Sequence, residues 1–69
     1  MNHIQITIIA GAEEQELLIA QLSGYEAVGF EQLDDSLLVY FQEDMFHSYE
    51  INELLKRFGC EGTPVRKTL

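Results

Sequence analysis

The stretch Ser36-Leu37-Leu38-Val39-Tyr40-Phe41-Gln42 decides how this chain of 69 residues folds. When the stretch is extended, Leu37, Val39 and Phe41 point to one side, and Leu38 and Tyr40 point to the other. A strand that is apolar on both sides belongs inside a sheet, because one side joins the core and the second is either covered or used. The sequence therefore predicts an interior strand here, with a second side that is a candidate binding surface.

Three other segments predict strands. Within residues 2–9, Ile4, Ile6 and Ile8 alternate with polar residues, which is typical of a half-buried strand. Residues 25–33 alternate in the same way and lead into the 36–42 strand through a predicted tight turn at Asp34-Asp35. After Pro64, which reopens an extended segment, a last short strand is predicted over residues 65–69, most easily at an edge of the sheet.

Two helices are predicted between these strands. Gly11-Ala12 ends the first strand, and three glutamates then favour the positive end of a helix that runs to about Leu22 and stops at Gly24. The second helix has apolar residues at i, i+3, i+4 and i+7, with Ser48 as its expected N-cap and Gly59 as the residue that ends it. Its apolar positions are Ile51, Leu54, Leu55 and Phe58.

The order strand, helix, strand, strand, helix, strand predicts a single α+β domain over residues 1–69, with the split βαβ or ferredoxin-like fold. In that fold one four-stranded antiparallel sheet carries both helices on one face, and the other face stays open. The expected core residues are Ile4, Ile6, Ile8, Val28, Phe30, Leu37, Val39 and Phe41 from the strands, and Leu18, Leu22, Ile51, Leu54, Leu55 and Phe58 from the helices.

Charge is the most unusual property of the composition. Twelve Asp and Glu against four Lys and Arg give a formal net charge of −8 at pH 7. Binding of nucleic acid or of an anionic membrane surface is disfavoured, since both depend on Lys and Arg. Two interpretations of the acidity stay open: a solvated surface that favours solubility, or steering of a basic partner. The four basic residues all follow Leu55 and are Lys56, Arg57, Arg66 and Lys67.

The N-terminal sequence and the cysteine content indicate a cytoplasmic location. The start of the chain lacks the basic residues and the long apolar run of a signal peptide, and no apolar run approaches the roughly 20 residues of a membrane span. The single cysteine, Cys60, excludes an internal disulfide and a CxxC pair. Lys56 and Arg57 are the kind of neighbours that lower a thiol pKa, but a structural cysteine is the interpretation we favour.

Residues that carry chemistry are few and scattered, so we expect no catalytic, cofactor-binding or metal-binding residue in this chain. His3 and His47 have no nucleophile or carboxylate at catalytic spacing, and His47 beside Asp44 is more typical of a loop than of a metal site. The paired acids at 34–35 and 43–44 lack the spacing of an EF-hand loop. The glycines are too scattered for a dinucleotide-binding or phosphate-binding loop.

The remaining candidate site is the predicted open face of the sheet. Leu38 and Tyr40 lie on it, joined by His3, Gln5 and Thr7 if the first and third strands are neighbours. Tyrosine is favoured at interfaces, because it brings a large area and one hydrogen bond at low entropy cost. A short sheet also exposes some apolar atoms without any partner, so a binding surface and an ordinary surface both remain open.

Several segments resemble one known family. They are Ile4-Gln5-Ile6-Thr7-Ile8, residues 13–22, Gly29-Phe30-Glu31, Val39-Tyr40-Phe41 and Ile51-Asn52-Glu53-Leu54-Leu55, and together they extend across nearly the whole chain. These segments resemble the amino-terminal domain of the PrmA family, with the Gly-Phe-Glu step as the most distinctive motif. Members of that family are bacterial methyltransferases that use S-adenosylmethionine to methylate ribosomal protein eleven of the large subunit, on lysine side chains and on its terminal amine.

The resemblance implies a substrate-recognition domain of a ribosomal protein lysine methyltransferase, since members of the family carry an amino-terminal ferredoxin-like domain that recognises the ribosomal protein. In that family, S-adenosylmethionine binds a separate Rossmann-type domain, so no catalysis is expected within residues 1–69. The chain would be the N-terminal part of a longer methyltransferase or a stand-alone relative. The implied partner is a basic ribosomal protein of the large subunit, bound without direct contact to nucleic acid.

Two other functions remain open. A small-molecule regulatory domain of the ACT type has the same strand and helix order and a similar size, and it binds amino acids where two sheets meet. Such domains often have a glycine after the first strand, as Gly11 is here. A homodimerisation module would instead pair the open face with a second copy of the chain.

Overall fold

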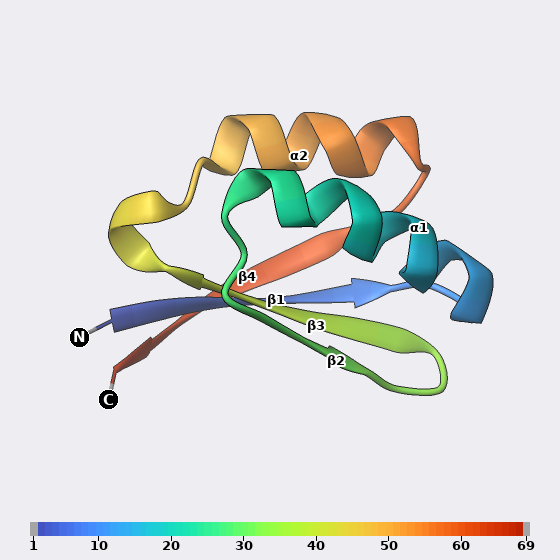
Figure 1. Ribbon diagram of the computed structural model, residues 1–69, viewed down its shortest axis with the longest axis horizontal. Coiled ribbons are helices and arrows are strands. Elements are labelled where there is room, and N and C mark those ends of the chain that lie inside the picture. Colours follow the sequence, from blue (N-terminus) through green and yellow to red (C-terminus); the bar gives the residue numbers. More distant parts are fainter. Residues whose placement is uncertain (1, 69) are drawn as a thin grey trace.

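A computed structural model describes residues 2–68, and the side chains of residues 2–66. It contains one antiparallel sheet with both helices on the same face, as Figure 1 shows. The strands lie in the order β2-β3-β1-β4. This confirms the predicted α+β, ferredoxin-like fold. The elements are β1 (Asn2–Ile9), α1 (Ala12–Leu22), β2 (Gly29–Gln32), β3 (Ser36–Gln42), α2 (Ser48–Arg57) and β4 (Gly62–Thr68), with short 3-10 turns at Ser23–Tyr25 and Glu43–Met45.

The two strands with the clearest alternation have the predicted bounds at both ends. β1 and β3 pair directly, with Ile6 opposite Val39 and Thr7 opposite Leu38. The last strand is longer than predicted, since β4 begins at Gly62 and pairs along the full length of β1. Leu69, which the prediction included in that strand, lies outside the described residues.

Helix α2 begins one residue earlier than predicted. Ser48 is already helical, and His47 is the N-cap residue, without a side-chain hydrogen bond to the first turn. The prediction of Ser48 as the N-cap is therefore wrong. The end of the helix is as predicted: Lys56 and Arg57 lie in the last turn, and Gly59 follows with φ +68°, the left-handed conformation that glycine adopts most easily.

The prediction that Val28 faces the core is wrong, since its side chain is 56% exposed. The Val28 N–H donates to the Tyr40 carbonyl at 2.7 Å, and Tyr40 is also the register partner of Gly29. Two consecutive residues thus oppose one residue of β3, as in a β-bulge, and the alternation breaks before β2 begins. Phe30, beyond the break, packs against the core as predicted.

The core forms between the sheet and the two helices. Most of the predicted members are fully buried, while Ile4, Phe30 and Phe58 are partly buried against them. Ala10, which the prediction omitted, belongs to the core as well. The buried apolar residues are Ile6, Ile8, Ala10, Leu18, Leu22, Leu37, Val39, Phe41, Ile51, Leu54 and Leu55.

A buried amide connects helix α1 to the sheet. Gln15 is only 1% exposed, and its Nε2 donates to the Ala10 carbonyl at 2.9 Å and to the Leu33 carbonyl at 2.8 Å. Ala10 follows β1 and Leu33 follows β2, so one side chain satisfies two carbonyls at the ends of two strands. Burial of a polar group is tolerated when it is hydrogen-bonded in this way.

We predict that Gln15→Ala lowers the free energy of unfolding by about 2–4 kcal/mol, because it leaves a cavity and two carbonyls without their donor. Urea denaturation followed by circular dichroism measures the change. The matched control is Gln21→Ala in the same helix, whose side chain is exposed, and it should change stability by less than about 0.5 kcal/mol. Equal stabilities of the two variants would contradict the role of the amide.

Gly62 marks the closest approach of β4 to the core. A Cβ atom there would lie 2.8 Å from Ile6 Cγ2 and 2.8 Å from Leu55 Cδ1, and both distances are shorter than a van der Waals contact between carbon atoms. Glycine at this position therefore lets the start of β4 pack beneath α2. By contrast, a Cβ atom on Gly24 would meet nothing within 4 Å.

We predict that Gly62→Ala destabilises the domain by about 1–3 kcal/mol through overpacking. Gly24→Ala, which adds the same methyl group where there is space, should leave the stability unchanged or raise it by up to about 1 kcal/mol. Thermal unfolding of the two variants gives the comparison. A Gly62→Ala variant as stable as the parent would show that Ile6 and Leu55 move aside without cost.

Candidate functional site

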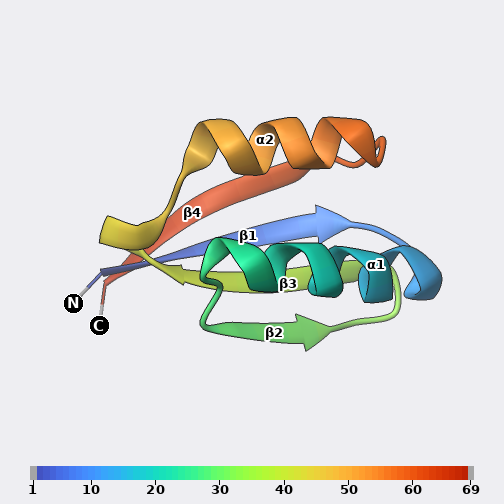
Figure 2. The same cartoon turned by 45° about the horizontal axis from the view of Figure 1, so that its top comes forward.

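One face of the sheet is left uncovered by the described residues. Figure 2 shows α1 and α2 side by side on one face, with α2 toward β4 and α1 toward β2 and β3. We call the opposite face the open face. Its residues follow from the strand register and from the burial of Ile6, Ile8, Val39 and Phe41 on the helix side. They are His3, Gln5, Thr7 and Ile9 from β1, Ser36, Leu38, Tyr40 and Gln42 from β3, Gly29 and Glu31 from β2, and Thr63 and Val65 from β4.

The five residues predicted for a binding surface all lie on the open face. Gln5 is opposite Tyr40 on one side and Val65 on the other, and Thr7 is opposite Leu38. His3, Gln5, Thr7, Leu38 and Tyr40 are each half-buried, because their neighbours on the sheet cover part of every side chain. The structure thus brings these residues into two adjacent rows across β1 and β3.

Tyr40 is the largest side chain at the centre of the open face. A Cβ atom on Gly29 would lie 3.7 Å from Tyr40 Cδ2, so the ring lies beside the bare backbone of β2. The Tyr40 hydroxyl donates to Glu31 Oε1 at 3.4 Å. Loss of hydration, the negative charge of Glu31 and this hydrogen bond together raise the pKa of Tyr40 above its usual value. Tyr40 therefore stays a neutral hydrogen-bond donor at physiological pH.

Two exposed apolar residues extend this surface beyond the prediction. Ile9 is 66% exposed and Val65 is 44% exposed. Ile9 continues the alternation of His3, Gln5 and Thr7, so its position could have been found from the sequence. Val65 could not, because the pairing of β4 with β1 sets which side of the sheet it faces. Among the strand residues of the open face with described side chains, Glu31 carries the one formal charge.

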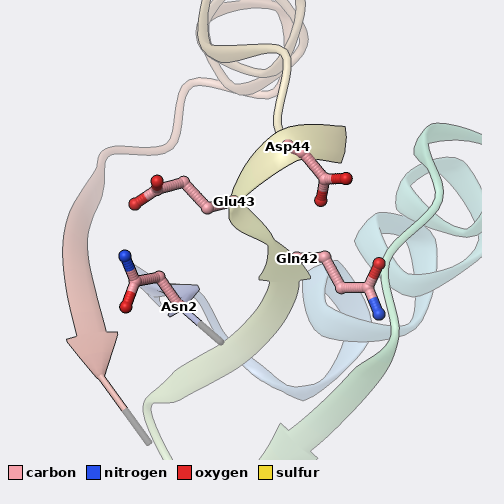
Figure 3. A pocket seen from close by; sticks show the side chains of 4 residues that line it. All are labelled: Asn2, Gln42, Glu43 and Asp44. Carbon is pink, nitrogen blue, oxygen red and sulfur yellow. The ribbon is translucent and has the colours of Figure 1, made fainter.

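A hollow at one end of the sheet is lined by polar side chains. Its volume is about 260 Å³, and Figure 3 shows Asn2 and Glu43 on one side of it, with Gln42 and Asp44 on the other. Glu43 forms an ion pair with Arg66 of β4, with Oε2 2.5 Å from Nε. Sites for small molecules usually enclose about 300–1,000 Å³ between mainly apolar walls. This hollow is smaller, and all four residues that line it are polar or acidic, so its geometry does not favour a ligand.

The residues that carry chemistry are not assembled into a reactive site. Within residues 2–68, no three His, Cys, Asp or Glu side chains lie close enough together to hold a metal ion. Cys60 Sγ lies 3.7 Å from Glu14 Oε2 and donates to it. Burial raises the pKa of the Cys60 thiol, and the negative charge of Glu14 raises it further. The alternative in which Lys56 and Arg57 lower this pKa, which the sequence analysis did not favour, does not hold, because a carboxylate is the charged neighbour that the thiol contacts.

No helix in the described part of the chain is both long enough and apolar enough to cross a membrane. The longer of the two helices has 11 residues, against the roughly 20 residues of a membrane span.

Comparison with known proteins identifies no relative of this chain. No protein-family model, no curated protein and no solved structure matches this chain. The resemblance to the PrmA family therefore stays a prediction from the short segments quoted above.

We predict that Cys60 reacts slowly with iodoacetamide in the folded protein, with a pH midpoint above that of an ordinary cysteine, because its thiolate is disfavoured. Glu14→Gln removes the negative charge and should lower that midpoint, so alkylation at pH 8 becomes faster. Mass spectrometry of alkylation against pH measures both proteins, and the urea-unfolded chain supplies the reference. A midpoint that does not move in Glu14→Gln would contradict the role of the carboxylate.

Proposed function

We propose that this chain is a protein-binding domain whose contact surface is the open face. One observation carries the proposal: partly exposed apolar side chains from three strands, including Leu38, Tyr40 and Val65, share a sheet face that no described element covers. Side chains fixed on paired strands lose little entropy when a partner packs on them. Tyr40 adds a hydroxyl that is already oriented by Glu31.

The shape of the surface favours a protein over a small molecule. Small-molecule sites are concave, whereas the open face presents rows of side chains along a sheet. The backbone conformation at Gly11 also does not support an amino-acid site of the ACT type. Gly11 has φ −76° and ψ 173°, an extended conformation that any residue adopts, and a Cβ atom there would meet Glu14 Oε1 at 3.8 Å. Glycine is thus not required by the backbone at that position.

The charge of the chain favours a basic partner. A net charge of −8 attracts a basic protein over a distance of about 10 Å at moderate ionic strength, and so speeds their encounter. The same charge disfavours pairing of the open face with a second copy, because two copies carry the same sign. We therefore propose a basic protein as the partner. Sedimentation at high protein concentration tests the alternative, because a dimer there would favour pairing with a second copy.

The resemblance suggests which basic protein to test. We propose large-subunit ribosomal protein eleven as the partner, with this chain as the substrate-recognition domain of a ribosomal protein methyltransferase that acts in the cytoplasm. The ferredoxin-like fold agrees with the fold that the resemblance implies, which supports the proposal. S-adenosylmethionine and the catalytic residues would then belong to a separate domain.

We predict that the double variant Leu38→Ala/Tyr40→Ala binds ribosomal protein eleven at least tenfold more weakly, since buried aromatic and aliphatic anchors usually contribute most of the binding energy. Isothermal titration calorimetry measures the affinity. Because both side chains are partly exposed, the melting temperature should fall by only a few degrees.

Tyr49→Ala is the matched control for this variant, because Tyr49 is an exposed tyrosine on helix α2, away from the open face. It should leave the affinity unchanged. An unaltered affinity of the double variant, with a native circular dichroism spectrum, would rule out the open face as the contact. No binding by the parent chain would rule out this partner.

A further inference from the structure

We infer that the free edge of β2 is a second contact site, which accepts an extended basic segment of a protein partner as an added strand. We call this the β2 edge; it consists of Gly29–Gln32 and the flanking residues Val28 and Leu33. No strand of the described chain lies beyond it in the sheet order. The inference goes beyond the proposed function, because it involves backbone groups rather than the side chains of the open face.

The hydrogen-bonding pattern shows which backbone groups are free. The Leu33 N–H donates to the Ser36 carbonyl at 2.9 Å and is thus directed toward β3, while the Leu33 carbonyl accepts from Gln15 Nε2. In an antiparallel pair, alternate residues face the neighbouring strand. Phe30 and Gln32 therefore direct their N–H and C=O groups outward. These two residues, with one donor and one acceptor each, offer four backbone groups to an added strand.

The opposite edge of the sheet carries residues that oppose strand addition. β4 contains Pro64, which has no N–H to donate, and Arg66, which forms an ion pair with Glu43. β2 has neither a proline nor a Lys or Arg, and the exposed apolar residues Val28 and Leu33 flank it. A chain adding to this sheet would therefore pair with β2, and its apolar side chains could contact the two flanking residues.

The charge around the β2 edge specifies the chemistry of the added segment. Glu26 precedes the strand, Glu31 lies within it, and Asp34-Asp35 follows it, while residues 2–55 contain no Lys or Arg. All four basic residues lie in α2 and β4, toward the other edge of the sheet (Figure 2). A segment with alternating Lys or Arg would gain from these carboxylates. Because four backbone groups give limited affinity, this charge attraction is needed for binding.

The same features disfavour a second copy as the occupant. Pairing of two β2 edges would bring the acids of one copy against the identical acids of the other. Pairing of β2 with β4 of a second copy is opposed by Pro64. The occupant that fits the charge and the backbone is an extended basic segment of a different protein.

A labelled ten-residue peptide of alternating lysine and valine is the probe for this inference. In the free protein, the amides of Phe30 and Gln32 should exchange rapidly with solvent, while the amide of Leu33 is protected. At saturating peptide, the amides of Phe30 and Gln32 should become protected at least tenfold, as measured by hydrogen exchange and nuclear magnetic resonance. The peptide affinity, from fluorescence anisotropy, should fall as salt is added.

Gln32→Pro tests the outward N–H directly, because it removes that donor while the hydrogen bonds of β2 to β3 remain. Peptide affinity should fall about tenfold. Gln32→Thr keeps the N–H and should retain the affinity. Persistent protection of the Leu33 amide in both variants would show that β2 is still paired. Val65→Ala changes the open face on β4, at the other edge of the sheet, and should bind the peptide normally, which separates this site from the open face.

Three outcomes would overturn the inference. In the first, the peptide binds without protecting the amides of Phe30 and Gln32. In the second, a peptide with glutamate in place of lysine binds equally well. In the third, no binding is found at low salt. Sedimentation that shows a dimer, with these same amides protected in the absence of peptide, would assign the β2 edge to a second copy instead.

Discussion

The burial of one side of β3 under the two helices sets the orientation of every other strand. Leu37, Val39 and Phe41 are fully buried. A shift of one residue would expose all three and bury Leu38 and Tyr40, so the register has one favourable solution. β3 pairs with both β1 and β2, and β1 pairs with β4, so this choice is transmitted across the sheet. The composition of the open face is a consequence of it.

The sequence pattern predicted the parts of the fold that local alternation determines. β1, β3 and the apolar stripe of α2 need only the period of two or 3.6 residues, and they were predicted with correct bounds or within a residue. Features that depend on partners far along the chain were missed. The bulge that exposes Val28 requires the Tyr40 carbonyl, the burial of Gln15 requires the Leu33 carbonyl, and the start of β4 requires pairing with β1.

In the open face, too, local alternation predicted some features, and others depend on residues far along the chain. The alternation of β1 and β3 placed His3, Gln5, Thr7, Leu38 and Tyr40 on one side, and the sheet brings them together. The hydrogen bond from Tyr40 to Glu31 could not be predicted, because it depends on the shift in alternation that precedes β2. The identity of the proposed partner rests on the resemblance and on the net charge of −8.

Glu31 connects the two proposed contacts. Its side chain lies on the open face and accepts the Tyr40 hydroxyl, and its backbone belongs to the strand whose outer edge is free. A basic strand added beside β2 would place its own side chains next to Glu31, on the same face as Tyr40. A lysine there would neutralise the charge that helps to raise the pKa of Tyr40, and it would compete for the same carboxylate. Strand addition would thus change the hydrogen bonding of the Tyr40 hydroxyl, so the two proposed contacts would be coupled through Glu31.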